Sequence, residues 1–360
     1  LNEPVERSTT MRIFDGGVKE FQIRNLNLKD EGYRAGDTIT GEVVLVTSRE
    51  IKCNSFAVFF SGTANTEWSQ REGEDVERYN DYEKIVKECT IFYGQGILAP
   101  GQYLHKFAFR FPTNCPASFE GPYGNISYII KVKIDRPMAI DHEIFTEVIC
   151  KGATLNLNKL PPVIAQPVEV EGMGEFRSCG CKHGSVRISA CLPKVGYALG
   201  ENAELQINVE NCSRKPIVML AANILENAIY DGMNDITSQP VYYIYGVGYP
   251  GRITSTKPIF TANMVVNIMP QSQQKVDFIF SIPMFLTPQV RCSLIHTEHV
   301  IELCVKRLDG KTVSECILPL TIGTVPLNRS IRKPDTSGGC YKSASLPQPL
   351  EPTQLPSVDC

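Results

Sequence analysis

Three cysteines and one histidine near the middle of the chain are the residues best suited to bind a metal. Cys179, Cys181 and His183 fall within the sequence Cys-Gly-Cys-Lys-His, and Cys191 follows shortly after. Thiolate and imidazole groups are good zinc ligands, but a structural zinc site needs four ligands and usually takes them from paired Cys-x-x-Cys motifs. Because that spacing is missing, we interpret the segment as exposed thiols in a linker and predict no metal site.

Two histidines, His296 and His299, have the spacing H-x-x-H. On a strand, residues three positions apart point to opposite faces, so these side chains cannot hold one ion. Cysteine and histidine could also form a nucleophilic dyad, but the sequence has no nucleophile elbow and no complete Gly-x-x-x-x-Gly-Lys-Ser/Thr phosphate-binding loop. We therefore expect no catalytic site, no cofactor and no enzymatic activity.

Lys131, Lys133 and Arg136 form a basic cluster on a segment with strand-like alternation. Because lysine and arginine pair well with phosphate, the cluster could contact a phosphorylated partner. Charge runs of this kind are more often a solvated face, which is the interpretation that we favour. The three residues stay a candidate partner-binding site.

The bulk composition limits the class of partner. The chain has 36 basic and 39 acidic residues, and this lack of a basic excess disfavours a nucleic-acid partner. No stretch approaches the roughly 20 apolar residues of a membrane helix, and residues 1–10 lack the apolar core of a signal peptide. The 13 cysteines are odd in number and irregularly spaced, so we expect free thiols in a reducing, cytoplasmic environment.

Alternation of apolar and polar residues recurs along most of the chain. Such a period of two predicts strands with one buried face, as in antiparallel sheets packed face to face. Clear examples are residues 107–111, 130–134, 205–209 and 276–282. Residues 220–230 favour a strand or irregular segment, and the highly charged residues 75–89 indicate a long exposed connection. The expected fold class is all-β.

An internal repeat predicts two sandwiches of related topology. Three short patterns recur in the same order, at residues 32–37 and 196–201, 107–112 and 278–283, and 132–135 and 306–309. Prolines and glycines interrupt the chain between the two copies. We expect an N-terminal β-sandwich over 12–154, a linker over 155–183, a C-terminal β-sandwich over 184–327 and a disordered, proline-containing tail over 328–360.

Three segments resemble the arrestin family, and in particular the α-arrestins or arrestin-domain-containing proteins. Residues 107–137 resemble the end of the N-terminal arrestin domain, with a Phe-rich strand ending in Pro, a Gly-x-Tyr-Gly turn and a strand ending in Asp-Arg-Pro. Residues 185–213 are similar to the start of the C-terminal domain, and residues 318–326 to its last strand. The resemblance implies two antiparallel sandwiches and a non-enzymatic adaptor for membrane-protein cargo, recruited to the plasma membrane or endosomes by peripheral association only.

One feature of many α-arrestins is missing from this sequence. Such proteins recruit WW-domain ubiquitin ligases through Pro-Pro-x-Tyr motifs, but Pro161-Pro162 precedes Val163-Ile164 and no Pro-Pro pair follows residue 327. The nearest match, residues 239–242, lacks the first proline. We expect transporters or receptors as partners, with any ubiquitin-ligase contact indirect. The alternative is a sorting scaffold like the retromer subunits that use the arrestin fold.

Overall fold

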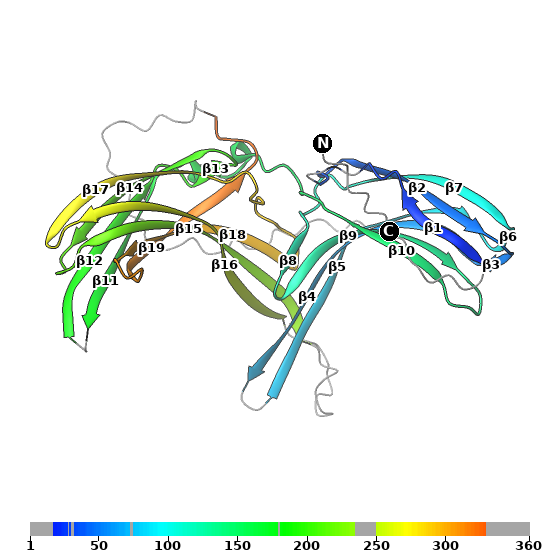
Figure 1. Ribbon diagram of the computed structural model, residues 1–360, viewed down its shortest axis with the longest axis horizontal. Coiled ribbons are helices and arrows are strands. Elements are labelled where there is room, and N and C mark those ends of the chain that lie inside the picture. The colour runs from blue at the N-terminus through cyan, green and yellow to red at the C-terminus, as the bar shows by residue number, and fades with distance from the viewer. Residues whose placement is uncertain are drawn as a thin grey trace.

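The computed structural model describes residues 17–27, 29, 32–72, 75–178, 181–234 and 250–328. These residues form two lobes of antiparallel strands, which confirms the predicted all-β, two-sandwich fold (Figure 1). The only helical segments in this part of the chain are two short 3-10 turns, η1 (Leu157–Lys159) and η2 (Pro162–Ala165). Across the same residues, no helix has the length and apolar character needed to span a membrane.

The first lobe packs the three-stranded sheet β1-β2-β7 against strands β10, β9, β4 and β5. Its strands are β1 (Val18–Arg24), β2 (Thr38–Thr47), β3 (Ile51–Cys53), β4 (Ser55–Glu72), β5 (Asp75–Tyr93), β6 (Gly96–Leu98), β7 (Gly101–Arg110), β8 (Phe119–Gly121), β9 (Gly124–Asp135) and β10 (His142–Val148). Burial along β9 alternates with the sequence, so its apolar residues line the core and its lysines face outward.

The second lobe packs the four-stranded sheet β11-β12-β14-β17 against strands β15, β18 and β19. Its strands are β11 (Val168–Ser178), β12 (Cys181–Leu192), β13 (Gly196–Ala198), β14 (Asn202–Asn211), β15 (Ile217–Asn234), β16 (Pro250–Ile268), β17 (Ser272–Ser281), β18 (Ile295–Lys306) and β19 (Thr312–Gly323). Residues 220–230 lie within β15, in agreement with the strand interpretation.

One sheet joins the two lobes. A ten-stranded sheet runs in the order β10-β9-β4-β5-β15-β18-β19-β13, with β16 and β8 paired to its side. Among the described residues the link between the lobes is short, because β5 pairs with β15 only at Asn80↔Met233 and Tyr79↔Asn234. The core of the first lobe nevertheless contains second-lobe residues, namely Ala228, Tyr230, Val290, Leu294 and Ile295. The lobes therefore share part of one hydrophobic core.

Two segments differ from their predicted structure. Residues 75–89 are not an exposed connection but most of strand β5, which pairs with β4 from Asp75 to Tyr93. Backbone pairing and the buried side chains Tyr79 and Val86 outweigh a highly charged composition. In Figure 1, β4 and β5 project from the junction of the lobes as one long hairpin.

The second half of the predicted linker is also a strand, β11, at the edge of the four-stranded sheet. The glycines of this segment predict an interruption of regular structure, but in the structure Gly172 and Gly174 allow close packing within the strand. A side chain at Gly172 would collide with the backbone carbonyl of Glu315, and one at Gly174 with that of Val313. Glycine in a strand often marks such a close backbone approach.

The cysteines are free at eight described positions, five of them buried. Cys191 is disulfide-bonded, so the expectation of a fully reduced protein is wrong at this position. Local alternation gives no measure of the distance between two thiols, which decides whether they can join. Cys179, the side chains of residues 181–183, residues 239–242 and the predicted tail beyond Asn328 lie outside what the structure describes.

Candidate functional site

The outer edge of β5 is the feature best suited to bind a partner. β5 pairs with β4 along its length, but in the described part of the chain its other edge pairs with β15 only at Tyr79 and Asn80. Beyond Glu83, whose carboxylate accepts hydrogen bonds from the backbone and hydroxyl of Ser293, no described strand covers it. An open edge offers backbone donors and acceptors to an extended peptide.

Two structural devices restrict pairing along this edge. The register between β4 and β5 shifts at Gly62/Thr63 and at Phe56/Ala57, so the regular stretch runs from Val86 to Ile91. Glu88 lies opposite Phe60, a fully buried core residue, and yet is itself exposed at the rim. Bulges and inward-facing charges are typical ways to disfavour unspecific strand pairing. The edge is therefore open but selective.

The outward face of the same stretch is exposed and chemically mixed. Lys87, Cys89 and Ile91 alternate on this face, and Ile91 is 63% exposed. A strand added here would meet an apolar side chain at Ile91 on one face and the carboxylate of Glu88 on the other. The edge thus fits an extended segment with an apolar residue and a basic residue on opposite faces.

Aromatic packing holds the part of the β4–β5 hairpin near its turn against the second lobe. The rings of Trp68 and Tyr79 stack with centroids 5.1 Å apart. Gly232 lies against Trp68 and Gly251 against Tyr79, so closely that a side chain at either glycine would overlap the ring. The hydroxyl of Thr66 donates a 2.8 Å hydrogen bond to the carbonyl of Asp231.

A charged cluster around the buried carboxylate of Glu226 lies on β15, β16 and β18, between the two hydrophobic cores. The carboxylate of Glu226 lies 2.9 Å from Lys257 Nζ and 3.8 Å from His299 Nε2. Lys257 Nζ also lies 5.7 Å from the ring centroid of Phe119, which belongs to the first lobe. Burial opposes ionisation of Glu226, but contacts with His299 and Lys257 outweigh it and hold the pKa of the carboxyl below its usual value.

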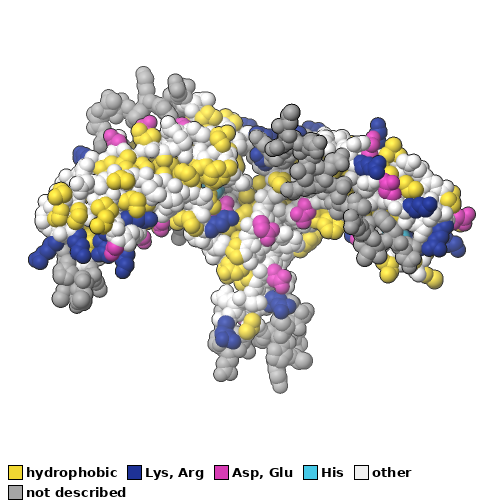
Figure 2. All heavy atoms as spheres, viewed as in Figure 1, with side chains coloured by type: hydrophobic (Ala, Val, Ile, Leu, Met, Phe, Trp, Pro, Cys, Tyr) yellow, Lys and Arg dark blue, Asp and Glu magenta, His cyan; other side chains and the backbone are white. Residues whose placement is uncertain are grey.

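The predicted basic cluster lies at the junction of β9 and β10, where its charges already have partners. Lys131 forms an ion pair with Glu143, and Lys133 Nζ lies 2.7 Å from Asp141. The backbone N–H of Arg136 donates to Asp141, and its Nη1 lies 3.0 Å from His142 Nε2. Basic and acidic side chains are interspersed over the face of the molecule in Figure 2. The structure brings the three residues together but not as an unpaired cationic patch.

The two histidines lie on β18, on opposite faces as predicted. His299 is buried beside Glu226, whereas His296 is only half-buried and faces the other way. Burial lowers the pKa of His296. The role of His299 in a charged cluster was missed in the sequence. The signal for that cluster was Glu226, the single charged residue within the apolar run 220–230.

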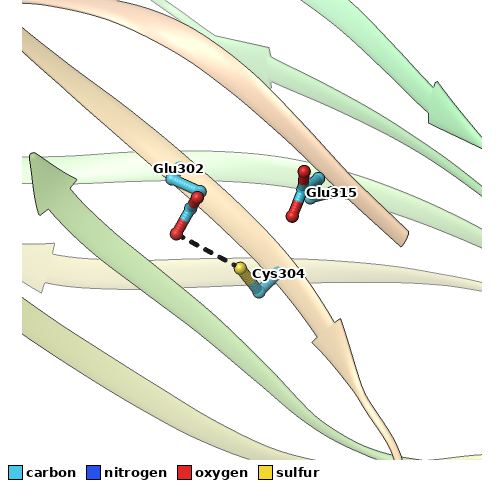
Figure 3. Close-up of side chains that lie close together, drawn as sticks. All are labelled: Glu302, Cys304 and Glu315. Atoms are coloured by element: carbon cyan, nitrogen blue, oxygen red, sulfur yellow. Dashed lines mark hydrogen bonds between the residues drawn. The ribbon is translucent and has the colours of Figure 1, made fainter. Parts of the chain in front are cut away.

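A second group of chemically active side chains lies on β18 and β19. Glu302, Cys304 and Glu315 have potential ligand atoms within 4.8 Å of one another (Figure 3). The Cys304 thiol points toward Glu302 at 3.5 Å, and the amide of Asn223 donates to Glu302 at 2.7 Å. Burial and the neighbouring carboxylates raise the pKa of Cys304 to about 11. A protonated thiol that donates to Glu302 makes this a hydrogen-bonded cluster, not a preformed metal site.

Comparison with known proteins agrees with the fold. Residues 23–151 match the family described as "Arrestin (or S-antigen), N-terminal domain", and residues 182–327 match "Arrestin (or S-antigen), C-terminal domain". Arrestin domain-containing protein 1 of Rattus norvegicus is 27% identical over 346 residues, covering 96% of this chain and 73% of the rat protein. Arrestin domain-containing protein 4 of Mus musculus is 23% identical over 371 residues, covering 96% of this chain and 83% of the mouse protein.

Two antiparallel sandwiches joined through a shared sheet define a two-domain protein of arrestin type. The chain belongs to the arrestin family, and its relatives place it with the α-arrestins, the arrestin domain-containing proteins. This is a family of arrestin-like adaptors.

Proposed function

We propose that this protein is a non-enzymatic adaptor in membrane-protein trafficking, which recognises cargo for endocytosis, sorting or ubiquitination. The observation on which the proposal depends is the open, selective edge of β5 between Val86 and Ile91. An adaptor must bind segments of other proteins without chemical change, and strand addition does this through backbone hydrogen bonds. Family membership supports the same role.

The proposed ligand is an extended cytoplasmic segment of a transporter or receptor. Such a segment would add to β5 as a further strand and place a basic side chain near Glu88 and an apolar side chain near Ile91. The adaptor would act in the cytoplasm and reach the plasma membrane or endosomes through its cargo. Residues 12–154 stay our proposed first domain, and the second, predicted over 184–327, also takes in β11 and the start of β12. Lys131, Lys133 and Arg136 stay a proposed second contact, where a phosphate would have to replace Asp141 and Glu143.

The test is site-specific cross-linking in cells. A photoreactive amino acid replaces Lys87 on the β5 edge in the full chain, and in a matched control it replaces Lys275, an exposed lysine on β17. We expect adducts with membrane proteins, through their cytoplasmic segments, at position 87 and far fewer at position 275. Equal yields at both positions would contradict the β5 site. Adducts mainly with soluble coat subunits would favour the alternative of a sorting scaffold.

Reversal of the charge at Glu88 should remove binding. We expect Glu88→Lys to weaken binding of the cross-linked cargo segment by more than tenfold, because it places like charges together and removes the selective carboxylate. Glu88→Gln should have a smaller effect, since the neutral amide removes the attraction to a basic side chain without adding repulsion. The control is Glu50→Lys, an exposed position outside this edge, and the measurement is the Kd by fluorescence anisotropy. If Glu88→Lys and Glu50→Lys raised the Kd equally, the loss of affinity would come from net charge and the proposed contact at Glu88 would be wrong.

Direct contact with a WW-domain ubiquitin ligase should be absent or weak. Two prolines preset an extended conformation, and the tyrosine of a Pro-Pro-x-Tyr ligand then fills an aromatic groove. The chain contains no such motif, and Tyr341 has no proline close upstream. Titration of purified WW domains against the full chain and against a copy ending at Leu327 should give no micromolar binding. Micromolar binding that disappears with the shortened copy would contradict this prediction.

A further inference from the structure

Two buried thiols face each other in the first lobe. Cys115 follows β7, Cys150 follows β10, and their Sγ atoms lie 3.5 Å apart. Both residues are free and almost fully buried. A disulfide requires an Sγ–Sγ distance of about 2.0 Å, so the two sulfur atoms would have to approach each other by about 1.5 Å to join.

The backbone on both sides of the thiol pair is fixed by hydrogen bonds. Ser118 N–H donates to the carbonyl of Cys150 at 2.7 Å, and Cys150 N–H donates to Ser118 Oγ at 3.0 Å. The Tyr128 hydroxyl donates to the carbonyl of Pro116 at 2.7 Å. These bonds hold the loop after β7 against the segment after β10, so the two thiols stay close together.

The two thiols are chemically unequal. Their mutual hydrogen bond lowers the pKa of Cys115 in spite of burial. The same hydrogen bond, together with burial, raises the pKa of Cys150. Gly152 N–H also donates to Cys150 Sγ at 3.3 Å. Cys115 is thus the thiol more readily ionised, and Cys150 is held beside it in the protonated form.

We propose that Cys115 and Cys150 are a peroxide-responsive thiol pair that forms a reversible intramolecular disulfide. The Cys115 thiolate attacks one oxygen of hydrogen peroxide, the O–O bond breaks, and Cys115 sulfenic acid and hydroxide result. Cys150 sulfur then attacks the sulfenic sulfur, the S–O bond breaks, and the released hydroxyl leaves as water with the Cys150 proton. A dithiol reductant reverses the reaction by two thiol exchanges, in which the dithiol is oxidised to its own disulfide.

The position of the pair suggests what the disulfide would change. Tyr33 N–H donates to the carbonyl of Ile149, and Lys151 N–H donates to the carbonyl of Tyr33. The chain after Lys151 leads directly to the η1 and η2 turns between the lobes. A disulfide would join the loop after β7 to the start of this connection and so restrict local opening of the first lobe.

The remaining thiols provide internal controls. Cys53 is buried in the same lobe, and its thiol donates to the carbonyl of Gly94 at 3.7 Å instead of facing a second thiol. Cys89 and Cys212 are exposed. If exposure alone decided the site of oxidation, Cys89 and Cys212 would be oxidised first. The proposed pair predicts instead that the free thiols of Cys115 and Cys150 are lost together.

The experiment titrates the folded full chain with hydrogen peroxide, blocks free thiols with an alkylating agent and maps the peptides by mass spectrometry. We expect one cross-linked Cys115–Cys150 peptide, equal loss of both free thiols, recovery with dithiothreitol and a rise in Tm of about 5 °C. Cys53→Ser should leave these results unchanged. Cys150→Ser should trap Cys115 as a sulfenic acid that reacts with dimedone.

The wild-type measurement decides the question even if a variant fails to fold. Oxidation confined to Cys89 and Cys212, with Cys115 and Cys150 still alkylated as free thiols after unfolding, would overturn the proposal. So would a cross-link that joins either residue to a different cysteine.

Discussion

Replacement of Tyr230 by alanine is expected to destabilise the protein by about 3–5 kcal/mol, the usual cost of removing a large buried aromatic side chain. Tyr230 lies on β15 and is 0% exposed. Its ring centroid lies 5.6 Å from that of Tyr123 and 6.2 Å from that of Phe119, both from the first lobe. The substitution would therefore open a cavity between the lobes.

The loss of this contact should also separate the unfolding of the two lobes. We expect calorimetry of Tyr230→Ala to give two transitions where the native chain gives one, because the shared core is broken at its centre. Tyr230→Phe should cost only about 1 kcal/mol, since it removes just the hydroxyl that lies 3.3 Å from Ser255 Oγ. Tyr82→Ala, 55% exposed, is the control and should change stability by less than about 0.5 kcal/mol. Equal effects at positions 230 and 82 would contradict the shared core.

Most of the fold could be predicted from the sequence because the alternation of apolar and polar residues along a strand shows which of its faces is buried. Alternation along residues 130–134 and 205–209 corresponds to the burial patterns of β9 and β14. The repeated turns likewise mark equivalent strands in each lobe. Periodicity, however, shows which face of a strand is buried and gives no information about its neighbours. The pairing of Asn80 with Met233 joins segments far apart in the sequence.

The candidate site was missed for the same reason. An open edge is one with no strand beside it, and here β15 leaves β5 before Met233 and pairs with β18 from Met219 to Tyr230 instead. The charged residues 75–89 resembled a loop in composition, although backbone pairing with β4 makes them a strand. Glu226 was visible as a lone charge in an apolar run, but its partners Lys257 and His299 come from two other strands.

Replacement of Glu226 by glutamine should change how stability depends on pH. The pKa of Glu226 is lower in the folded protein than its usual value. A lowered folded-state pKa means that the ionised carboxylate stabilises the fold above the unfolded pKa of about 4.3. This stabilisation is lost as the pH falls through the lower, folded-state pKa. At neutral pH it is fully present.

We therefore expect Glu226→Gln to be less stable than the native chain by about 1–3 kcal/mol at pH 7, because the buried His299 and the largely exposed Lys257 both lose their charged partner. Urea unfolding from pH 7 down to pH 3 should show this difference shrinking below about pH 4.3. Glu210→Gln, which removes an exposed ion pair with Arg187, is the matched control and should cost less than about 1 kcal/mol. A difference between the native chain and Glu226→Gln that stays constant down to pH 3 would mean that the lost stability comes from packing and not from the charge of Glu226.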